Sequence, residues 1–186
     1  CPHDQVSLLD RLDENSHKHA FAVSEDLKYA AREAVELIGN EAVWYLREHF
    51  KEKIYGKDLA GELTRECLRY LYRLLFLFYV EARDEELGYA PMKSEEYRTG
   101  YSLESLREIA ERELETEEDH NGYFLHHSLQ TLFRLIREGW LSQFKPAQIG
   151  DYGFQMSPLQ CDLFDPARTP LLFRVRLRNH VLQRVI

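Results

Sequence analysis

The chain has 186 residues, 44% hydrophobic and 12% aromatic, a composition that excludes an unstructured segment. Its formal net charge of -8 disfavours wholesale coating of nucleic acid, because phosphate binding needs a local positive field. The three cysteines form no Cys-x-x-Cys pair, which argues against a disulfide framework or a structural zinc site and favours a cytoplasmic protein. No apolar run approaches the ~20 residues that a membrane span requires.

The N-terminal part of the chain divides near Ser24. Residues 1–23 show little periodicity, so we expect a leader or arm, with the helical domain over 24–186. Ser24 is a good N-cap for a helix over 24–53, because acids follow it at the positive end of the helix dipole. The dipeptide Gly39-Asn40 predicts a kink or two nearly collinear helices.

The clearest helical pattern covers residues 58–83, with apolar side chains at spacings of three and four. Its second half is apolar nearly all round, which predicts that other helices enclose it. We expect this long helix to be the centre of the fold, with Leu74 and Phe78 fully enclosed.

Beyond this helix, Gly and Pro residues predict a loop over 84–101. Ser102 is expected to cap a short helix that ends near residue 114. Asn121 is expected to cap another helix, and Gly139 lies where its C-terminal cap should be.

The C-terminal part should begin with a long irregular segment over 141–170, which includes a short strand at 154–156. Thr169-Pro170 then suits the start of the last helix. Because the chain begins with Cys1 and ends within a helical pattern without a capping residue, we expect the native polypeptide to continue. The expected fold is an all-α bundle around a long central helix, with one irregular segment before the last helix.

Charge is distributed unevenly along the chain. Residues 84–119 carry 13 acidic and 4 basic side chains, whereas residues 167–186 carry five arginines and no acid. The C-terminal cluster is therefore a candidate nucleic-acid contact, with pairing to a neighbouring domain as the alternative. Its members are Arg168, Arg174, Arg176, Arg178 and Arg184.

A second basic series lies on the long helix. Arg65, Arg69 and Arg73 recur every four residues, and Glu62 and Glu66 lie among them. We favour an ion-paired or solvated helix face over a phosphate site, because the acids neutralise part of the series.

The histidines lack the spacing of a metal site. His126 and His127 are adjacent, so on a helix they point about 100° apart and cannot face one metal ion. The pair His17 and His19 has no carboxylate ligands at a recognisable spacing. We therefore expect solvent-facing or core roles for all eight histidines.

Complete catalytic motifs are absent from the sequence. It has no Gly-x-Gly turn for a methyl donor or dinucleotide, no phosphate-binding loop and no Gly-x-Ser-x-Gly elbow. Arg174 and His180 fit the loose Arg-x(4 to 6)-His pattern of HEPN-type ribonucleases, where such a pair acts on a scissile phosphate. That pattern arises readily by chance in an arginine-rich helix.

Three stretches carry a family resemblance: LTRECLRYLYRLLFLFYVEAR at 63–83, FDPARTPLL at 164–172 and VRLRNHVLQRVI at 175–186. Shorter stretches at 122–125 and 129–136 add to it. In this order and spacing they resemble the region upstream of the catalytic domain in large bacterial adenine-specific DNA methyltransferases, of the type IIG restriction-modification and phage-defence kind.

The resemblance implies a parent polypeptide that transfers a methyl group from S-adenosylmethionine to adenine N6, sometimes with a fused nuclease. The Asn-Pro-Pro-Tyr type motif of that family has no counterpart here, so no catalytic, cofactor-binding or metal residue is carried over. The chain would be a helical scaffold that braces the catalytic domain or helps to seat DNA, with no cofactor of its own. A stand-alone helical interaction domain or HEPN-like ribonuclease is the alternative.

Overall fold

The computed structural model describes residues 8–51, 57–140, 154–159 and 161–186, with side chains from Glu25 onward in α1 and from Leu59 onward in α2. Helices dominate these residues, which confirms the all-α prediction. None of the described helices has the length and apolarity to cross a membrane. The elements are α1 (Leu8–Phe50), α2 (Lys57–Ala82), α3 (Asp84–Leu87), α4 (Glu95–Gly100), α5 (Leu103–Ala110), α6 (Glu117–Asn121), α7 (Phe124–Glu138), the 3-10 turn η1 (Pro166–Arg168), α8 (Pro170–Phe173) and α9 (Asn179–Val185).

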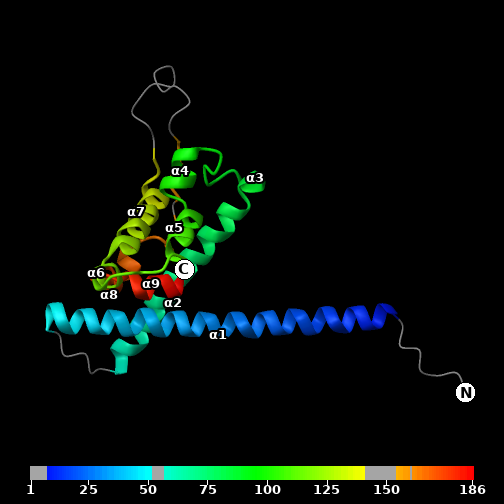
Figure 1. Ribbon diagram of the computed structural model, residues 1–186, viewed down its shortest axis with the longest axis horizontal. Helices are drawn as coiled ribbons and strands as arrows, with labels where there is room; N and C mark the ends of the chain where they lie inside the picture. The colour runs from blue at the N-terminus through cyan, green and yellow to red at the C-terminus, as the bar shows by residue number, and fades with distance from the viewer. Residues whose placement is uncertain (1–7, 52–56, 141–153, 160) are drawn as a thin grey trace, which may run out of the picture.

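The long helix α1 lies across one end of the other helices, and α2 rises from it (Figure 1). Helices α2 and α9 both contact α1, while α5 and α7 pack against each other. Helix α5 also contacts α2, and α7 contacts α9. Segments from both ends of the sequence therefore build one core.

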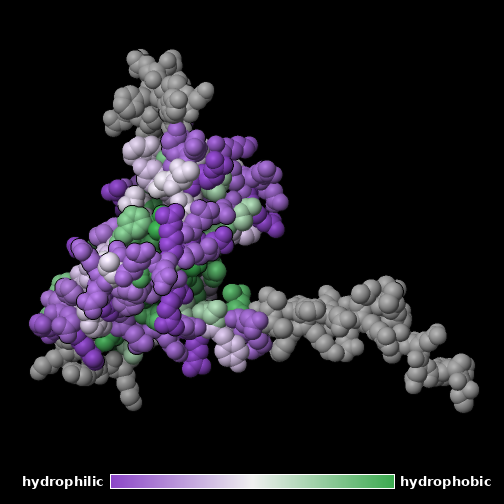
Figure 2. All heavy atoms as spheres, viewed as in Figure 1, coloured by the Kyte–Doolittle hydropathy of each residue, from purple (hydrophilic) through white to green (hydrophobic). Residues whose placement is uncertain are grey.

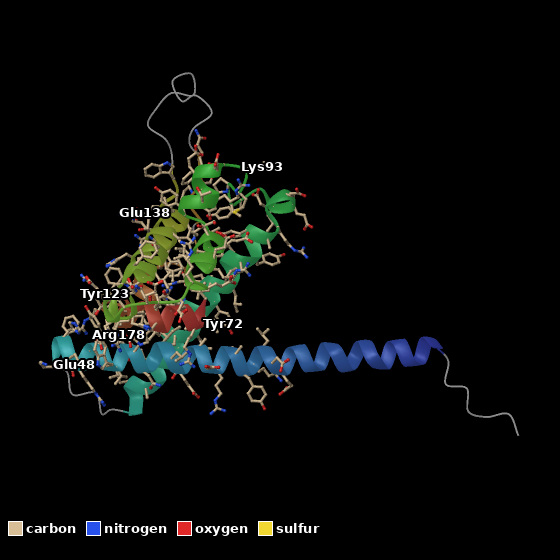
Figure 3. All side chains as sticks on the ribbon, viewed as in Figure 1. Glu48, Tyr72, Lys93, Tyr123, Glu138 and Arg178 are labelled. Atoms are coloured by element: carbon tan, nitrogen blue, oxygen red, sulfur yellow. The ribbon has the colours of Figure 1, made fainter. Side chains whose placement is uncertain are left out.

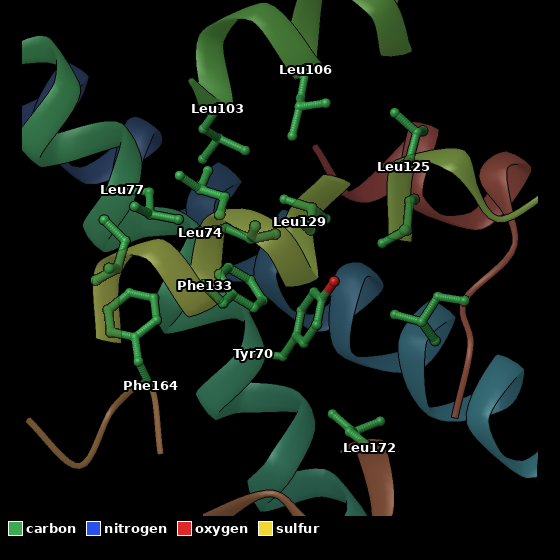
Figure 4. Close-up of a cluster of buried hydrophobic side chains, with 14 of the residues drawn as sticks. Tyr70, Leu74, Leu77, Leu103, Leu106, Leu125, Leu129, Phe133, Phe164 and Leu172 are labelled. Carbon is green, nitrogen blue, oxygen red and sulfur yellow. The ribbon is translucent and has the colours of Figure 1, made fainter. Parts of the chain in front are cut away.

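The core forms where the apolar faces of the longer helices meet (Figure 4). Helix α2 directs Tyr70, Leu74 and Leu77 inward, at the three- and four-residue spacing of one helix face. Helix α7 contributes Leu129 and Phe133 to the same core. The rings of Tyr70 and Phe133 pack edge to face, with their centroids 5.4 Å apart. Such close packing fixes how the helices sit on one another.

Helix α1 differs from the predicted helix in two respects. It begins at Leu8, so the expected start at Ser24 is wrong, although the division into an arm and a domain stays a prediction. It also continues through Gly39 as one helix. A Cβ atom at Gly39 would lie 3.8 Å from Sγ of Cys67 on α2, so this glycine lies where the two helices cross.

Helix α2 has nearly the bounds that the sequence predicts, but the other described helices leave one of its faces exposed. Leu74 is 1% exposed, as expected, whereas Phe78 is only partly buried. The outer face is exposed at Leu68, Tyr72, Leu75 and Tyr79. Apolar periodicity identified the helix correctly, but it could not tell whether the same chain covers all its sides.

The acidic middle of the chain is more helical than predicted. The expected loop over 84–101 contains α3 and α4. Ser102 does cap α5, because its Oγ accepts a hydrogen bond from the amide of Ser105, but the helix ends at Ala110. Thr116 begins the unpredicted helix α6 through a reciprocal capping box with Asp119.

Gly139 ends α7 with a φ of 73°, which confirms the predicted C-terminal cap. The chain then forms an isolated bridge in which the amide of Trp140 donates to the carbonyl of Met156 at 2.8 Å. Residues 141–153 and 160 of the predicted irregular segment lie outside the described residues. The single last helix expected from Thr169 is wrong, because α8 and α9 are separate and residues 174–178 join them.

Leu74 and its neighbour Leu75 provide a matched test of this core. Leu74→Ala should lower the free energy of unfolding by ~2 to 5 kcal/mol, because it leaves a cavity in an enclosed site. Leu75→Ala, at a position 42% exposed, should cost less than about 1 kcal/mol. Urea unfolding measures the free energy of both variants. Equal losses of stability would show that the Leu74 face of α2 is not part of the core.

Candidate functional site

Arg178, one of the five predicted nucleic-acid residues, is directed toward α1 (Figure 3). Its Nε donates to Oε1 of Glu41 at 2.7 Å and its Nη2 donates to Oε2 at 2.8 Å. The guanidinium carbon also lies 3.7 Å from the centroid of the Trp44 ring. The hydrogen bond to Glu41 raises the pKa of Arg178. This arginine therefore holds the C-terminal segment on the first helix.

Two more of these arginines pair with acids of the chain. Arg184 pairs with Glu33 on α1, and Arg168 donates to Oδ2 of Asp162 at 2.6 Å. Both pairs are exposed, so each contributes little to stability. The positive charge that the sequence places at the C-terminal end is thus largely matched by acids from elsewhere in the chain.

Arg174 and His180, the ribonuclease-like pair, have different neighbours. The guanidinium carbon of Arg174 lies 4.7 Å from the centroid of the Phe50 ring, at the end of α1. The Nδ1 atom of His180 is 3.0 Å from the carbonyl oxygen of His120. Arg176 is exposed, and no ion pair to it occurs within the described part of the chain.

Asn179 caps the N-terminus of α7 from a distant part of the chain. Its Oδ1 accepts the amide of Leu125 at 3.0 Å and its Nδ2 donates to the carbonyl of Asp119 at 2.9 Å. A Cβ atom at Gly122 would lie 2.9 Å from that Nδ2 atom, so a side chain there would collide with the cap. The predicted cap Asn121 is wrong, because this residue ends α6.

His126 and His127 face different surroundings, as their adjacency on a helix predicts. His126 is buried, and its Nδ1 accepts the amide of Leu177 at 3.3 Å, while His127 is exposed. Burial lowers the pKa of His126 to about 4. The side chains of His17 and His19 lie outside the described residues, and the described ones contain no group of three potential metal ligands.

Glu66 caps α8 rather than pairing with the arginines around it. The buried carboxylate accepts the amides of Leu171 at 3.3 Å and Leu172 at 2.9 Å, at the N-terminus of α8. Arg65 instead donates to the carbonyl of Gly61 one turn earlier. The expectation of an ion-paired or solvated face is therefore wrong at this position.

Arg73 is likewise buried, and it holds the segment that precedes α8. Its Nε donates to the carbonyl of Leu163 at 2.7 Å, and its Nη2 donates to the carbonyl of Asp165 and to Oγ1 of Thr169. Arg69 adds a hydrogen bond to the carbonyl of Asp162. This segment is irregular, so its carbonyls obtain partners from α2 instead of from a ladder of their own.

Glu81, near the C-terminal end of α2, caps α5 as Glu66 caps α8. Its carboxylate accepts the amides of Leu103 at 2.8 Å and Glu104 at 3.1 Å, and the hydroxyl of Tyr97 at 2.9 Å. Burial raises the pKa of Glu81, and these hydrogen bonds oppose that shift. The first amides of α5 thus obtain a buried anionic cap.

The opposite face of α2 carries exposed Leu and Tyr side chains. Figure 2 shows hydrophobic residues on the surface near α1, where α2 crosses it. We define the α2 stripe as Leu68, Tyr72, Leu75 and Tyr79, which are 37%, 57%, 42% and 52% exposed. Their spacings of four, three and four residues put them on one side of the helix. A continuous exposed apolar row of this kind is typical of a surface that another helix or domain covers.

Comparison with known proteins gives no assignment: no family model, curated protein or solved structure matches the chain. The α2 stripe and the C-terminal arginines are therefore judged on their own geometry.

Removing Arg178 should destabilise the chain strongly. Arg178→Ala leaves the carboxylate of Glu41, 4% exposed, without its guanidinium, which should cost about 3 kcal/mol. Arg184→Ala is the matched control, because its pair with Glu33 is exposed and should cost under about 1 kcal/mol. Chemical denaturation compares the two variants; equal small losses would contradict the bracing role of Arg178.

His126 should make stability depend on pH. Its pKa falls from 6.5 to about 4 on folding, so the unfolded chain binds more protons between these values. The stability associated with neutral His126 is fully present above pH 6.5 and is lost as the pH falls toward 4. At pH 5 the free energy of unfolding should be lower by about 2 kcal/mol for this reason. His126→Gln, which retains an acceptor, should lose less stability than the unsubstituted chain between pH 7 and pH 5. Identical pH dependence in urea titrations would rule out this role.

Proposed function

We propose that this chain is a non-catalytic helical scaffold of a restriction-modification type adenine-N6 DNA methyltransferase, and that it braces the catalytic domain of the same cytoplasmic polypeptide. S-adenosylmethionine and the target adenine would be bound by that catalytic domain. The proposal is supported by the sequence resemblance over stretches 63–83, 164–172 and 175–186. The structural observation that carries it is the α2 stripe.

The α2 stripe supports bracing because it lies on an element that is fixed from the other side. Glu66, Arg73 and Glu81 bind segments on the inner face of α2, so the helix cannot turn its apolar side chains inward without breaking those hydrogen bonds. The stripe therefore stays available to a neighbouring domain. Burying one half-exposed Leu or Tyr contributes about 1 kcal/mol or more, so four such side chains form a substantial contact.

Within this proposal, bracing is favoured over DNA seating. Arg178 and Arg184 are paired with α1, so a DNA phosphate would have to compete with Glu41 and Glu33 for them. Sequence-independent DNA binding by the cluster in the parent protein would rest mainly on Arg176, which is exposed and has no ion pair among the described residues.

The alternative is a stand-alone interaction or HEPN-like ribonuclease domain. The α2 stripe would suit an interaction domain equally well, whereas the different neighbours of Arg174 and His180 give the ribonuclease no support. Sequencing the complete reading frame distinguishes the methyltransferase scaffold from a stand-alone domain. We expect an Asn-Pro-Pro-Tyr type motif downstream of this region, and its absence would reject the methyltransferase proposal.

The bracing role has a direct test in the complete protein. Tyr72→Glu together with Leu75→Glu should lower its melting temperature and its adenine methylation at least several-fold, because charge would enter a buried contact. In the isolated chain the same pair should barely change the melting temperature, since both positions are exposed. Tyr29→Glu, at an exposed aromatic residue on α1, is the control. Unchanged methylation by the double variant would reject this contact.

A further inference from the structure

A cavity of about 400 Å³ lies between α2, α7 and the C-terminal segment 164–173. Its size falls within the range of small-molecule sites. Side chains from three separate parts of the sequence meet around it. The lining includes Tyr70, Arg73, His127, Gln130, Phe133 and Arg134.

The cavity is cationic in a chain that is acidic. Arg73, Arg134 and Arg137 line it together with His127, and no Asp or Glu is among the lining residues, although the chain has a net charge of -8. Arg137 pairs with Glu138 outside the cavity. Arg134 has no ion pair among the residues that the structure describes. A concave surface with charge of one sign concentrates ligands of the opposite sign.

Arg73 adds a buried positive charge to this cavity. The residue is 5% exposed, and its three hydrogen-bond acceptors are two carbonyls and the hydroxyl of Thr169. Burial lowers the pKa of Arg73, and the nearby carboxylates of Asp165 and Glu66 oppose that shift, although neither forms an ion pair with it among the described residues. These carboxylates offset only part of the cost of burying the guanidinium, so an anion in the cavity would be stabilised by Arg73.

Aromatic side chains form the apolar part of the lining. The ring centroids of Phe133 and Phe164 are 5.7 Å apart, and the guanidinium carbon of Arg73 lies 5.5 Å from the Phe133 centroid. Tyr70 packs against Phe133, and its buried hydroxyl has no hydrogen-bond partner in the described part of the chain. The lining thus offers flat apolar surface beside guanidinium groups.

We propose that this cavity binds a phosphate monoester with a flat apolar body, the chemistry of a nucleotide. Arg73 and Arg134, the two lining guanidinium groups without an ion pair among the described residues, suit a group with nearly two negative charges, which a phosphate monoester carries near neutral pH, better than a single carboxylate. The aromatic lining accommodates the apolar body, and the amide of Gln130 is available to a polar edge of it.

This ligand chemistry has two sources, a free nucleotide and the phosphorylated end of a nucleic-acid strand. Adenosine 5′-monophosphate represents the first, and a short single-stranded oligonucleotide with or without a 5′-phosphate represents the second. Preference for the free nucleotide would identify a small-molecule site, whereas preference for the phosphorylated strand would identify an end-binding site.

Calorimetric titration of the 186-residue chain tests the proposal, with adenosine and inorganic phosphate as partial ligands. Adenosine 5′-monophosphate should bind more tightly than either partial ligand. Arg134→Glu should weaken its binding by about tenfold or more, because a charged hydrogen bond is replaced by repulsion. Arg98→Glu makes the same charge change at an exposed position of α4, outside the cavity, and should leave binding unchanged.

Three results would overturn the proposal. Adenosine binding as tightly as its monophosphate would reject the phosphate site. Equal weakening by Arg134→Glu and Arg98→Glu would show a general charge effect. No binding of any nucleotide or strand, with both variants folded by circular dichroism, would leave the cavity without this ligand class. None of these results depends on the α2 stripe, so they leave the bracing proposal standing.

Discussion

The fold depends on three charged side chains on one face of α2, which satisfy backbone groups elsewhere. Glu66, Arg73 and Glu81 are separated by seven and eight residues, about two helical turns each, so they share a face. Each is buried, and each binds amides or carbonyls rather than an opposite charge. A buried backbone group without a partner is costly, so this face of α2 determines where α5, α8 and the segment before α8 can lie.

The C-terminal segment is fixed by a second set of contacts of the same kind. Glu41 holds both the side chain and the amide of Arg178, and Asn179 caps α7. Residues 174–178 lie between two helices and have little regular structure of their own. Their order comes from polar side chains of α1 and α7, which explains how so irregular a connection can be part of a core.

Sequence patterns predicted helix bounds and short-range caps, but they missed the caps that join residues far apart in the sequence. The bounds of α2, the Ser102 cap and the glycine at the end of α7 follow from periodicity and short-range cap chemistry. The caps supplied by Glu66 and Asn179 join residues 106 and 54 positions apart, and no local signal marks such pairs. The sequence analysis also missed the exposed α2 stripe. An apolar position in a helical pattern does not show whether its own chain or another one covers it.

The same contacts decide which positive charges remain available. Residues 167–186 contain five arginines and no acid, yet Glu41 and Glu33 of α1 form ion pairs with two of these arginines. On α7, His127, Gln130, Thr131 and Arg134 follow a three- and four-residue spacing that the sequence displayed but that no motif singled out. Because folding pairs Arg168, Arg178 and Arg184 with acids and leaves the charge of Arg134 facing a cavity, anion binding is better sought on α7 than where the arginines are densest.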